Sequence, residues 1–184
     1  MRMKYLARFI MWLGGWKYTG DIPREKKAVI ISVPHTSNWD FFWGELAFLS
    51  QGIPAYILMK KEFFFFPLGI LLRWLRVIPV DRGNKDSHLV AQMVEEFKQR
   101  DSMYLCITPE GSRKKRKKWK KGFLVIAKAA GVPVYLGRID YKEKSCKVGP
   151  LFYPTEDVDA DLEYIMSTYH DAHPKYPENF SYGE

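Results

Sequence analysis

His35 and Asp40 are the two residues whose types and spacing best suit catalysis. They lie in the segment Pro34-His-Thr-Ser-Asn-Trp-Asp40, which directly follows an apolar stretch. A tight turn of this length can bring the carboxylate back to the imidazole, where it fixes the ring tautomer and stabilises the imidazolium. Such a pair is a general base that suits activation of a substrate's own hydroxyl group. The alternative is a structural histidine that caps a helix, with the aspartate as a surface charge.

Two arginines, Arg82 and Arg113, each lie just beyond another apolar stretch. Functional groups of open α/β sheets collect beyond the carboxyl ends of the strands, so both are expected near His35. Gly111 lets the backbone turn closely enough for its amides to face an anion. Two converging guanidinium groups would hold a phosphate. In the competing interpretation the arginines only pair with Asp81 and Glu110 in their own loops.

The elements that position these residues follow from the alternation of apolar and amphipathic stretches. It predicts an α/β fold, a single domain with a mostly parallel or mixed central sheet flanked by helices, preceded by an N-terminal amphipathic helix. The length of 184 residues fits one domain. Strands are expected at 27–33, 54–59, 77–80, 103–107 and 134–139, with a further hairpin strand at 145–152. Helices are expected at 39–50, 86–100, 122–130 and from 157 or 159 to 170, with a loose tail behind them.

Residues 1–18 are predicted to form an amphipathic helix at a membrane interface. Its apolar residues at helical spacing are Leu6, Phe9, Ile10 and Leu13, its basic residues are Arg2, Lys4 and Arg8, and its tryptophans are Trp12 and Trp16. Basic helices of this kind bind membrane surfaces, although a helix packed on the domain body has the same pattern. No apolar stretch reaches the roughly 18 residues of a spanning helix. We therefore expect a peripheral or monotopic protein on the cytoplasmic face of a membrane.

Four sequence blocks, taken together, resemble those of a known family. The blocks are His35-Thr-Ser-Asn-Trp-Asp40, Pro79-Val-Asp-Arg82, Pro109-Glu-Gly-Ser-Arg113 and Val132-Pro-Val134. They resemble, in the same order, the motifs of the glycerolipid acyltransferases, the family of 1-acylglycerol-3-phosphate O-acyltransferases. Ser112 stands where the family usually has Thr, which keeps the hydroxyl group. Pro34 stands where many members have Asn.

The resemblance implies roles for these residues. His35 would be the general base and Asp40 its orienting partner, while the acceptor's phosphate would be held by Arg82, Glu110, Gly111, Ser112 and Arg113. An acyl group would pass from acyl-CoA or acyl carrier protein to a lysophosphatidate-like acceptor in phospholipid biosynthesis, with residues 19–184 as the acyltransferase domain. The donor is a substrate, and neither a cofactor nor a metal is expected. An amino-acid-derived lipid or another lysophospholipid as acceptor, and a lipid-binding protein without catalysis, are the alternatives.

The positive charge of the chain is concentrated in one loop. Lys and Arg exceed Asp and Glu by 29 to 21, and residues 113–121 carry eight positive charges in nine positions. Such a run favours polyanionic partners, so a basic nucleic-acid-binding module is a competing hypothesis for the function. Because Arg113 already belongs to the third block, we favour a membrane surface with anionic lipids, and no nucleic acid is expected. Lys120 and Lys121 are candidate contacts for an anion or for the acyl donor.

An aromatic segment and two cysteines complete the sequence-based predictions. Residues 63–72 form an apolar run that is too short to span a bilayer, so it is either core or an interfacial segment. Cys106 lies in the apolar run 104–107 and is expected to be a buried reduced thiol. His170 and His173 are a weak metal pattern, and a helix end at the surface fits them better.

Overall fold

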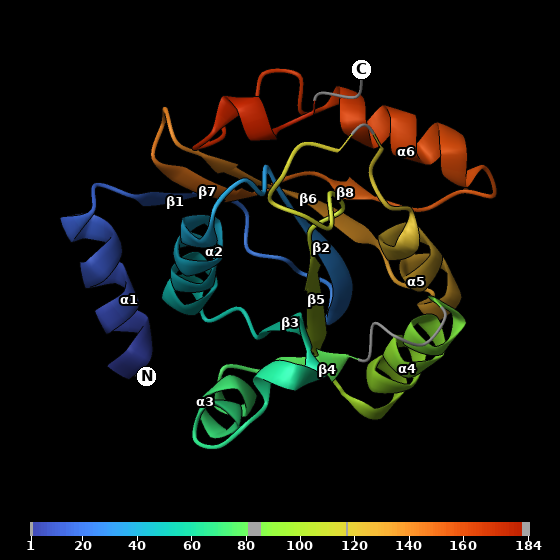
Figure 1. The fold of residues 1–184 in the computed structure, drawn as a ribbon, viewed down its shortest axis with the longest axis horizontal. Coiled ribbons are helices and arrows are strands. Elements are labelled where there is room, and N and C mark those ends of the chain that lie inside the picture. Colours follow the sequence, from blue (N-terminus) through green and yellow to red (C-terminus); the bar gives the residue numbers. More distant parts are fainter. Residues whose placement is uncertain (1, 81–85, 117, 182–184) are drawn as a thin grey trace.

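The centre of the fold is an eight-stranded mixed sheet (Figure 1). The computed structural model describes residues 2–80, 86–116 and 118–181. The strands are β1 (Lys17–Gly20), β2 (Lys27–Val33), β3 (Ala55–Lys60), β4 (Val77–Val80), β5 (Met103–Ile107), β6 (Val134–Asp140), β7 (Ser145–Val148) and β8 (Leu151–Phe152). Their order is β1-β7-β6-β2-β5-β3-β4, with β8 paired to β6. β2 lies parallel to both β5 and β6, whereas β7 and β8 run antiparallel to β6.

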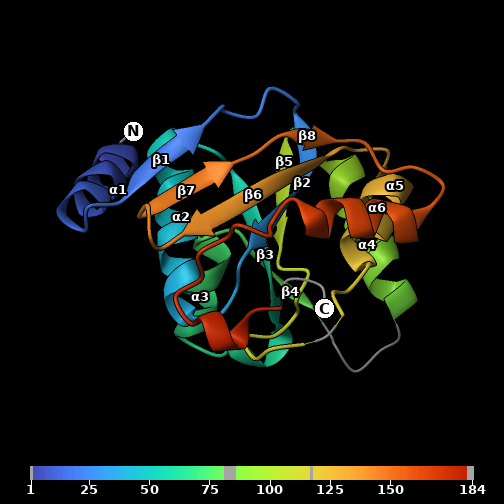
Figure 2. The same cartoon turned by 90° about the horizontal axis from the view of Figure 1, so that it is seen from above.

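Helices cover both faces of this sheet (Figures 1 and 2). The α-helices are α1 (Arg2–Leu13), α2 (Asn38–Gln51), α3 (Leu68–Trp74), α4 (Asp86–Gln99), α5 (Gly122–Ala130) and α6 (Val158–Ser167), and two 3₁₀ turns span Lys61–Phe63 and Pro177–Asn179. α1 packs on α2 on one side of the sheet, while α5 packs on α4 and α6 on the other. The prediction of an α/β domain with a mixed sheet and flanking helices is confirmed.

The hydrophobic core follows from the alternation of side chains along β2. Val29, Ile31 and Val33 point to the α4–α6 side and join the main buried cluster. Ala28 and Ile30 point to the α2 side and join a second cluster. A parallel strand covered on both faces reads as a continuous apolar run, which is why KAVIISV predicts this strand so well. The carboxyl end of β2 is thereby fixed from both sides, directly before His35.

Three expectations about the elements were incomplete or wrong. The helix predicted over residues 1–18 ends at Leu13, Trp16 is buried, and the residues after it form β1, which was not predicted because its four half-exposed residues lack an apolar pattern. The single strand expected at 145–152 is two strands, β7 and β8, because Gly149 and Pro150 lie outside the ladder between them. The tail is packed rather than loose, since Ala172, Phe180 and Ser181 are buried.

The tail packs because spaced apolar residues anchor a segment that has no regular periodicity. Phe180 is only 1% exposed, and the centroid of its ring lies 6.3 Å from that of Trp119. Trp119 also lies 5.7 Å from the ring of Tyr169. The segment after α6 therefore runs back across the sheet toward α2 (Figures 1 and 2).

Two helices present large apolar side chains to solvent. α1 buries Ala7 and Met11, and its exposed side chains include Tyr5, Leu6, Phe9, Trp12 and Leu13. The aromatic segment before and within α3 is largely exposed instead of forming core: Phe63, Phe65, Phe66, Ile70, Leu71 and Trp74 are accessible, Phe66 to 83%. Among the residues that the structure describes, no helix is both long enough and apolar enough to cross a membrane.

Candidate active site

His35 and Asp40 come together just beyond the carboxyl end of β2. Nδ1 of His35 lies 3.5 Å from Oδ2 of Asp40, with exposed side-chain fractions of 21% and 2%. The separation is longer than a hydrogen bond of normal length, so it is an electrostatic contact in this state. Catalytic contacts are often long before substrate binds, and a protonated imidazole would draw the pair closer. The arrangement turns Nδ1 to the carboxylate and leaves Nε2 for a substrate.

Asp40 is fixed by the same hydrogen bonds that begin α2. Ser37 is the N-cap: its Oγ accepts from the Trp39 amide at 3.1 Å, and Oδ2 of Asp40 accepts from the Ser37 amide at 2.7 Å. This reciprocal capping box satisfies amides that the helix itself leaves unpaired. The Thr36 amide donates to the same oxygen at 2.6 Å. A helix-starting motif thus also holds the carboxylate that faces His35.

The other oxygen of Asp40 has a partner that the sequence reading missed. The hydroxyl of Tyr141 donates to Oδ1 of Asp40 at 2.6 Å. Tyr141 follows β6 directly, and its ring lies edge-on to Trp16 with a centroid distance of 5.0 Å. Burial and then the hydrogen bond to Asp40 raise the pKa of the Tyr141 hydroxyl, so it stays protonated and donating. Its place just beyond a strand's carboxyl end was the signal that could have identified it.

Glu110 faces inward, beneath the His35 loop. Its Oε1 accepts from the His35 backbone amide at 2.8 Å, and its Oε2 is buried with no hydrogen-bond partner among the described residues. Burial, with a contribution from the nearby charge of Asp40, raises the pKa of Glu110 to about 8. The carboxyl group is therefore largely protonated at neutral pH. Arg113 does not pair with it, contrary to one of the readings of this loop.

The rest of the third block forms a turn beside the site. Gly111 adopts a positive φ of 62°, and a side chain there would meet Cε of Lys120 at 3.0 Å, so glycine suits the position. The hydroxyl of Ser112 accepts from the Lys114 amide at 3.1 Å. The guanidinium of Arg113 donates to Oδ1 of Asn38 in the first turn of α2. Arg113 is thus brought to the neighbourhood of His35.

The remaining predicted site residues have different outcomes. Arg82 lies outside the described residues, as does its proposed partner Asp81. Lys120 is exposed, with its stem over Gly111. Lys121 forms an ion pair with Asp159 at the start of α6.

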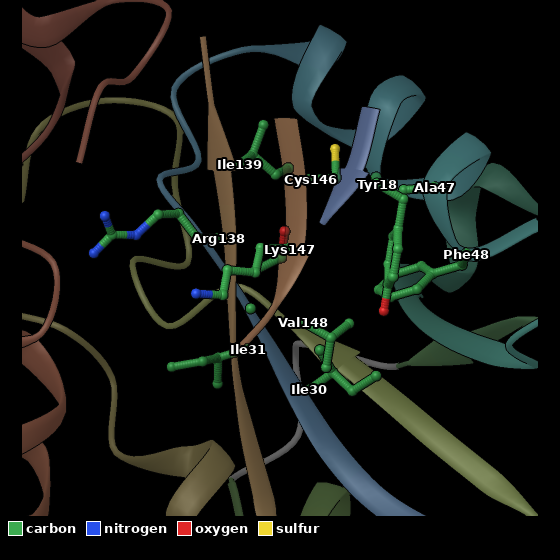
Figure 3. Close-up of a pocket in the computed structure, with 13 residues that line it drawn as sticks. Tyr18, Ile30, Ile31, Ala47, Phe48, Arg138, Ile139, Cys146, Lys147 and Val148 are labelled. Atoms are coloured by element: carbon green, nitrogen blue, oxygen red, sulfur yellow. The ribbon is translucent and has the colours of Figure 1, made fainter. Parts of the chain in front are cut away.

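A small apolar cavity lies between α2 and the sheet (Figure 3). It holds about 20 Å³, roughly the space of one water molecule. Its wall includes Ile30, Phe48, Gly137 and Val148. His35 and Arg113 do not line it, so this cavity is separate from the His35–Asp40 pair.

The two cysteines, His170 and His173 lie outside the His35–Asp40 site. Cys106 and Cys146 are free; Cys146 is buried, whereas Cys106, which was expected to be buried, is partly exposed. Desolvation still raises the pKa of each thiol to about 12, which makes both thiols unreactive. Nδ1 of His173 lies 2.9 Å from Oδ2 of Asp140. His170 contacts the Ser167 carbonyl. Within the described ranges, no three His, Cys, Asp or Glu side chains gather as metal ligands would.

These features define a class of protein. An α/β sheet with helices on both faces carries, at its carboxyl edge, an imidazole backed by a buried carboxylate and an arginine beside the same helix start. That combination suits general-base transfer chemistry on an anionic substrate.

Comparisons with known proteins identify the family. The model of the family described as Acyltransferase matches residues 16–136. The fold is similar to the crystal structure of the 1-acyl-sn-glycerophosphate acyltransferase PlsC from Thermotoga maritima, with a TM-score of 0.65 and 17% identity, over 91% of this chain and 75% of that one. A search among curated proteins gave no match. The chain belongs to the acyltransferase family, as its four sequence blocks predicted.

Proposed function

We propose that this acyltransferase esterifies the free hydroxyl of a lysophosphatidate-like acceptor, as a step of phospholipid biosynthesis. The observation that carries the proposal is the contact between His35 and Asp40, 3.5 Å apart at the carboxyl end of β2. A general base with an orienting carboxylate is what hydroxyl activation requires. The Arg113 turn next to it supplies positive charge for the acceptor's phosphate.

The proposed reaction has one transfer step and no acyl-enzyme intermediate. Nε2 of His35 removes the proton from the acceptor hydroxyl as that oxygen attacks the carbonyl carbon of the thioester. The bond from carbon to sulfur then breaks, and the thiolate takes the proton back from the imidazolium. Asp40 stabilises the imidazolium in between. The donor is acyl-CoA or acyl carrier protein, and neither a metal nor a cofactor takes part.

The acceptor's phosphate is assigned to the second and third blocks. Arg82 and Arg113 would bind its oxygens, because a planar guanidinium matches phosphate geometry. Backbone amides of the Gly111 turn and the Ser112 hydroxyl would donate further hydrogen bonds to the phosphate. The protonated Glu110 would hold the His35 loop in place by accepting from the His35 amide. Lys120 is exposed beside the turn and remains a candidate contact for the donor's phosphates, whereas Lys121 is occupied by Asp159.

A membrane surface is the proposed working environment, on its cytoplasmic face. The exposed apolar side chains of α1, with those of the segment 63–74, would enter the interface. The basic loop 113–121 would add attraction to anionic lipids of about 1 kcal/mol per residue near the surface. A lipid acceptor could then reach His35 without leaving the bilayer.

Swapping acceptors in one acyl-transfer assay tests the proposal. Wild-type protein is mixed with vesicles, labelled acyl-CoA or acyl carrier protein, and either lysophosphatidate, another lysophospholipid or an amino-acid-derived lipid. Transfer to lysophosphatidate at the highest kcat/KM supports the proposal. Preferred transfer to another acceptor would refute this acceptor but retain the chemistry, and vesicle binding without any transfer would refute the enzyme activity.

A further inference from the structure

The segment 168–181 after α6 lies against the loop that follows β2 and carries His35. Hydrogen bonds that involve backbone groups of this segment hold it there. The Tyr176 amide donates to Oγ1 of Thr36 at 3.3 Å. The Tyr141 amide donates to the His173 carbonyl at 2.9 Å. Lys175 is therefore placed between two residues that are each anchored to the surroundings of His35 and Asp40.

The ammonium group of Lys175 lies among aromatic rings next to this pair. Its Nζ is 5.2 Å from the ring centroid of Trp39, 5.9 Å from that of Tyr141 and 5.7 Å from that of Tyr176. Ring faces attract a cation within about 6 Å, but only weakly at a partly exposed site. No carboxylate within the described part of the chain forms an ion pair with Lys175. Its charge therefore lies beside these rings without an anionic partner among the described residues.

This cation and Arg113 contact neighbouring residues of one helix. Arg113 bonds to the side chain of Asn38, and Lys175 lies over the ring of Trp39. These two residues form the start of α2, directly after the His35 loop. Two positive groups therefore approach the same helix start from the 108–121 loop and from the C-terminal segment.

We propose that Lys175 is a second cation for the phosphomonoester group of the acceptor. This rests on the proposed function for the acceptor's identity. The ammonium group supplies a compact charge with three donors, and it complements the planar guanidinium of Arg113. It takes no part in proton transfer, so it selects among acceptors and leaves the chemical step to His35. The same chemistry could serve a phosphate of coenzyme A, and the kinetic measurements separate these two sources.

Steady-state kinetics of Lys175→Met, with Lys175→Arg as the conservative variant, tests the proposal. Lysophosphatidate is compared with a monoacylglycerol of the same acyl chain, which lacks the phosphate. We expect Lys175→Met to raise the KM for lysophosphatidate about tenfold, the effect of losing a hydrogen bond to a charged group. The KM for monoacylglycerol, the KM for the donor and kcat should stay near wild type, and Lys175→Arg should restore most of the loss.

Lys142→Met is the matched control, because Lys142 is exposed beside Tyr141 and has no role in the proposed site. It should leave all of these constants unchanged. An unchanged KM for lysophosphatidate in Lys175→Met would overturn the proposal. So would an equal rise for both acceptors, or a rise confined to the donor. A lowered melting temperature without a change in KM would assign Lys175 to holding the C-terminal segment only, which also overturns it.

Direct binding of sn-glycerol 3-phosphate, measured by titration calorimetry, separates this inference from the proposed function. We expect wild type to bind the probe about tenfold more tightly than Lys175→Met. If that difference is found but wild type transfers no acyl group, the proposed function fails and the phosphate site stands. If both proteins bind the probe equally, or wild type does not bind it, the inference fails whatever the transfer assay gives.

Discussion

The hydroxyl of Tyr141 donates a hydrogen bond of 2.6 Å to the carboxylate of Asp40, the residue that also faces His35. Because the Thr36 and Ser37 amides donate to the other carboxylate oxygen, Asp40 is held from both ends. Rotation of the carboxylate would break at least one of these bonds. We therefore expect Tyr141 to act as a positioning residue through its contact with Asp40.

Tyr141→Phe should lower kcat about tenfold while changing the acceptor KM little, because the freed Oδ1 of Asp40 loses the donor that orients it. The buried oxygen left without a partner should also reduce the free energy of unfolding by about 1–3 kcal/mol. Steady-state kinetics and denaturant unfolding measure the two effects. Tyr153→Phe is the control, because Tyr153 is exposed to solvent and has no role in the proposed site. A wild-type kcat in Tyr141→Phe would contradict the positioning role.

His35→Ala should lower turnover by roughly 10²–10⁴-fold, the usual contribution of a general base. The fold should be intact, because the His35 imidazole is partly exposed and only its backbone amide is bonded to Glu110. Circular dichroism and the melting temperature check the fold. His170→Ala, in an exposed turn after α6, should keep full activity. Retention of wild-type turnover by His35→Ala would refute the assignment of the base.

Glu110→Gln and Glu110→Ala should differ sharply. The amide oxygen of glutamine can still accept from the His35 amide, and the wild-type carboxyl is already largely neutral because its pKa is about 8. Glu110→Gln should therefore keep turnover within about threefold, whereas Glu110→Ala leaves a buried amide unpaired and should cost about 1–3 kcal/mol of stability. Kinetics and thermal unfolding distinguish them. Equal loss of turnover in both would instead indicate that the acidic group itself binds substrate.

Most of the fold could be predicted because the buried strands carry their own signal. β2, β4 and β5 have the predicted bounds, since each is an apolar run bounded by charged or turn-forming residues. β1 could not be predicted, because its pairing with β7 joins residues that are more than 120 positions apart and its side chains carry no pattern. The packing of the C-terminal tail could not be predicted for the same reason. Its burial depends on Trp119 and other residues of distant loops.

The candidate site was predictable only where the sequence spacing is short. His35 and Asp40 are linked by a capping box that can be read from the chain itself. Glu110 was found as a motif residue, but its inward orientation depends on how β5 lies beside β2. Tyr141 and Lys175 come from segments more than 100 residues away from Asp40. Only the position of Tyr141 directly after β6 marks it in the sequence, and no local pattern marks Lys175. Long-range packing, which sequence spacing does not encode, brings them to the site.

Phe66→Ser and Trp74→Ser should weaken vesicle binding. Both side chains are exposed on the segment 63–74, and transferring one such side chain out of water contributes about 1.5–3 kcal/mol, so each change should lower the partition constant about tenfold. Sedimentation with anionic vesicles measures it. Tyr153→Ser, an exposed aromatic residue outside α1 and the aromatic segment, is the control. Undiminished binding by both variants would remove this segment from the proposed membrane surface.

Glu45 should make the protein less stable as the pH rises. Burial raises its pKa to about 7 from an ordinary value of 4.5, against a weaker opposing effect of Arg76, and its Oε2 has no hydrogen-bond partner among the described residues. Between these two pH values the folded state binds more protons than the unfolded state, so the free energy of unfolding falls with increasing pH. The loss of unfolding free energy from this group is on the order of 3 kcal/mol. Glu110 acts in the same direction up to about pH 8.

Glu45→Gln should therefore be more stable than wild type at pH 8 and similar to it at pH 4.5, where the wild-type carboxyl is already neutral. Urea unfolding at a series of pH values measures the difference between the two proteins. Glu62→Gln, a change at an exposed residue, should follow the wild-type pH dependence. A constant difference between Glu45→Gln and wild type at every pH would mean that the carboxyl does not titrate in this range. Adding Glu110→Gln to Glu45→Gln should reduce the slope further, because the second raised pKa is then removed as well.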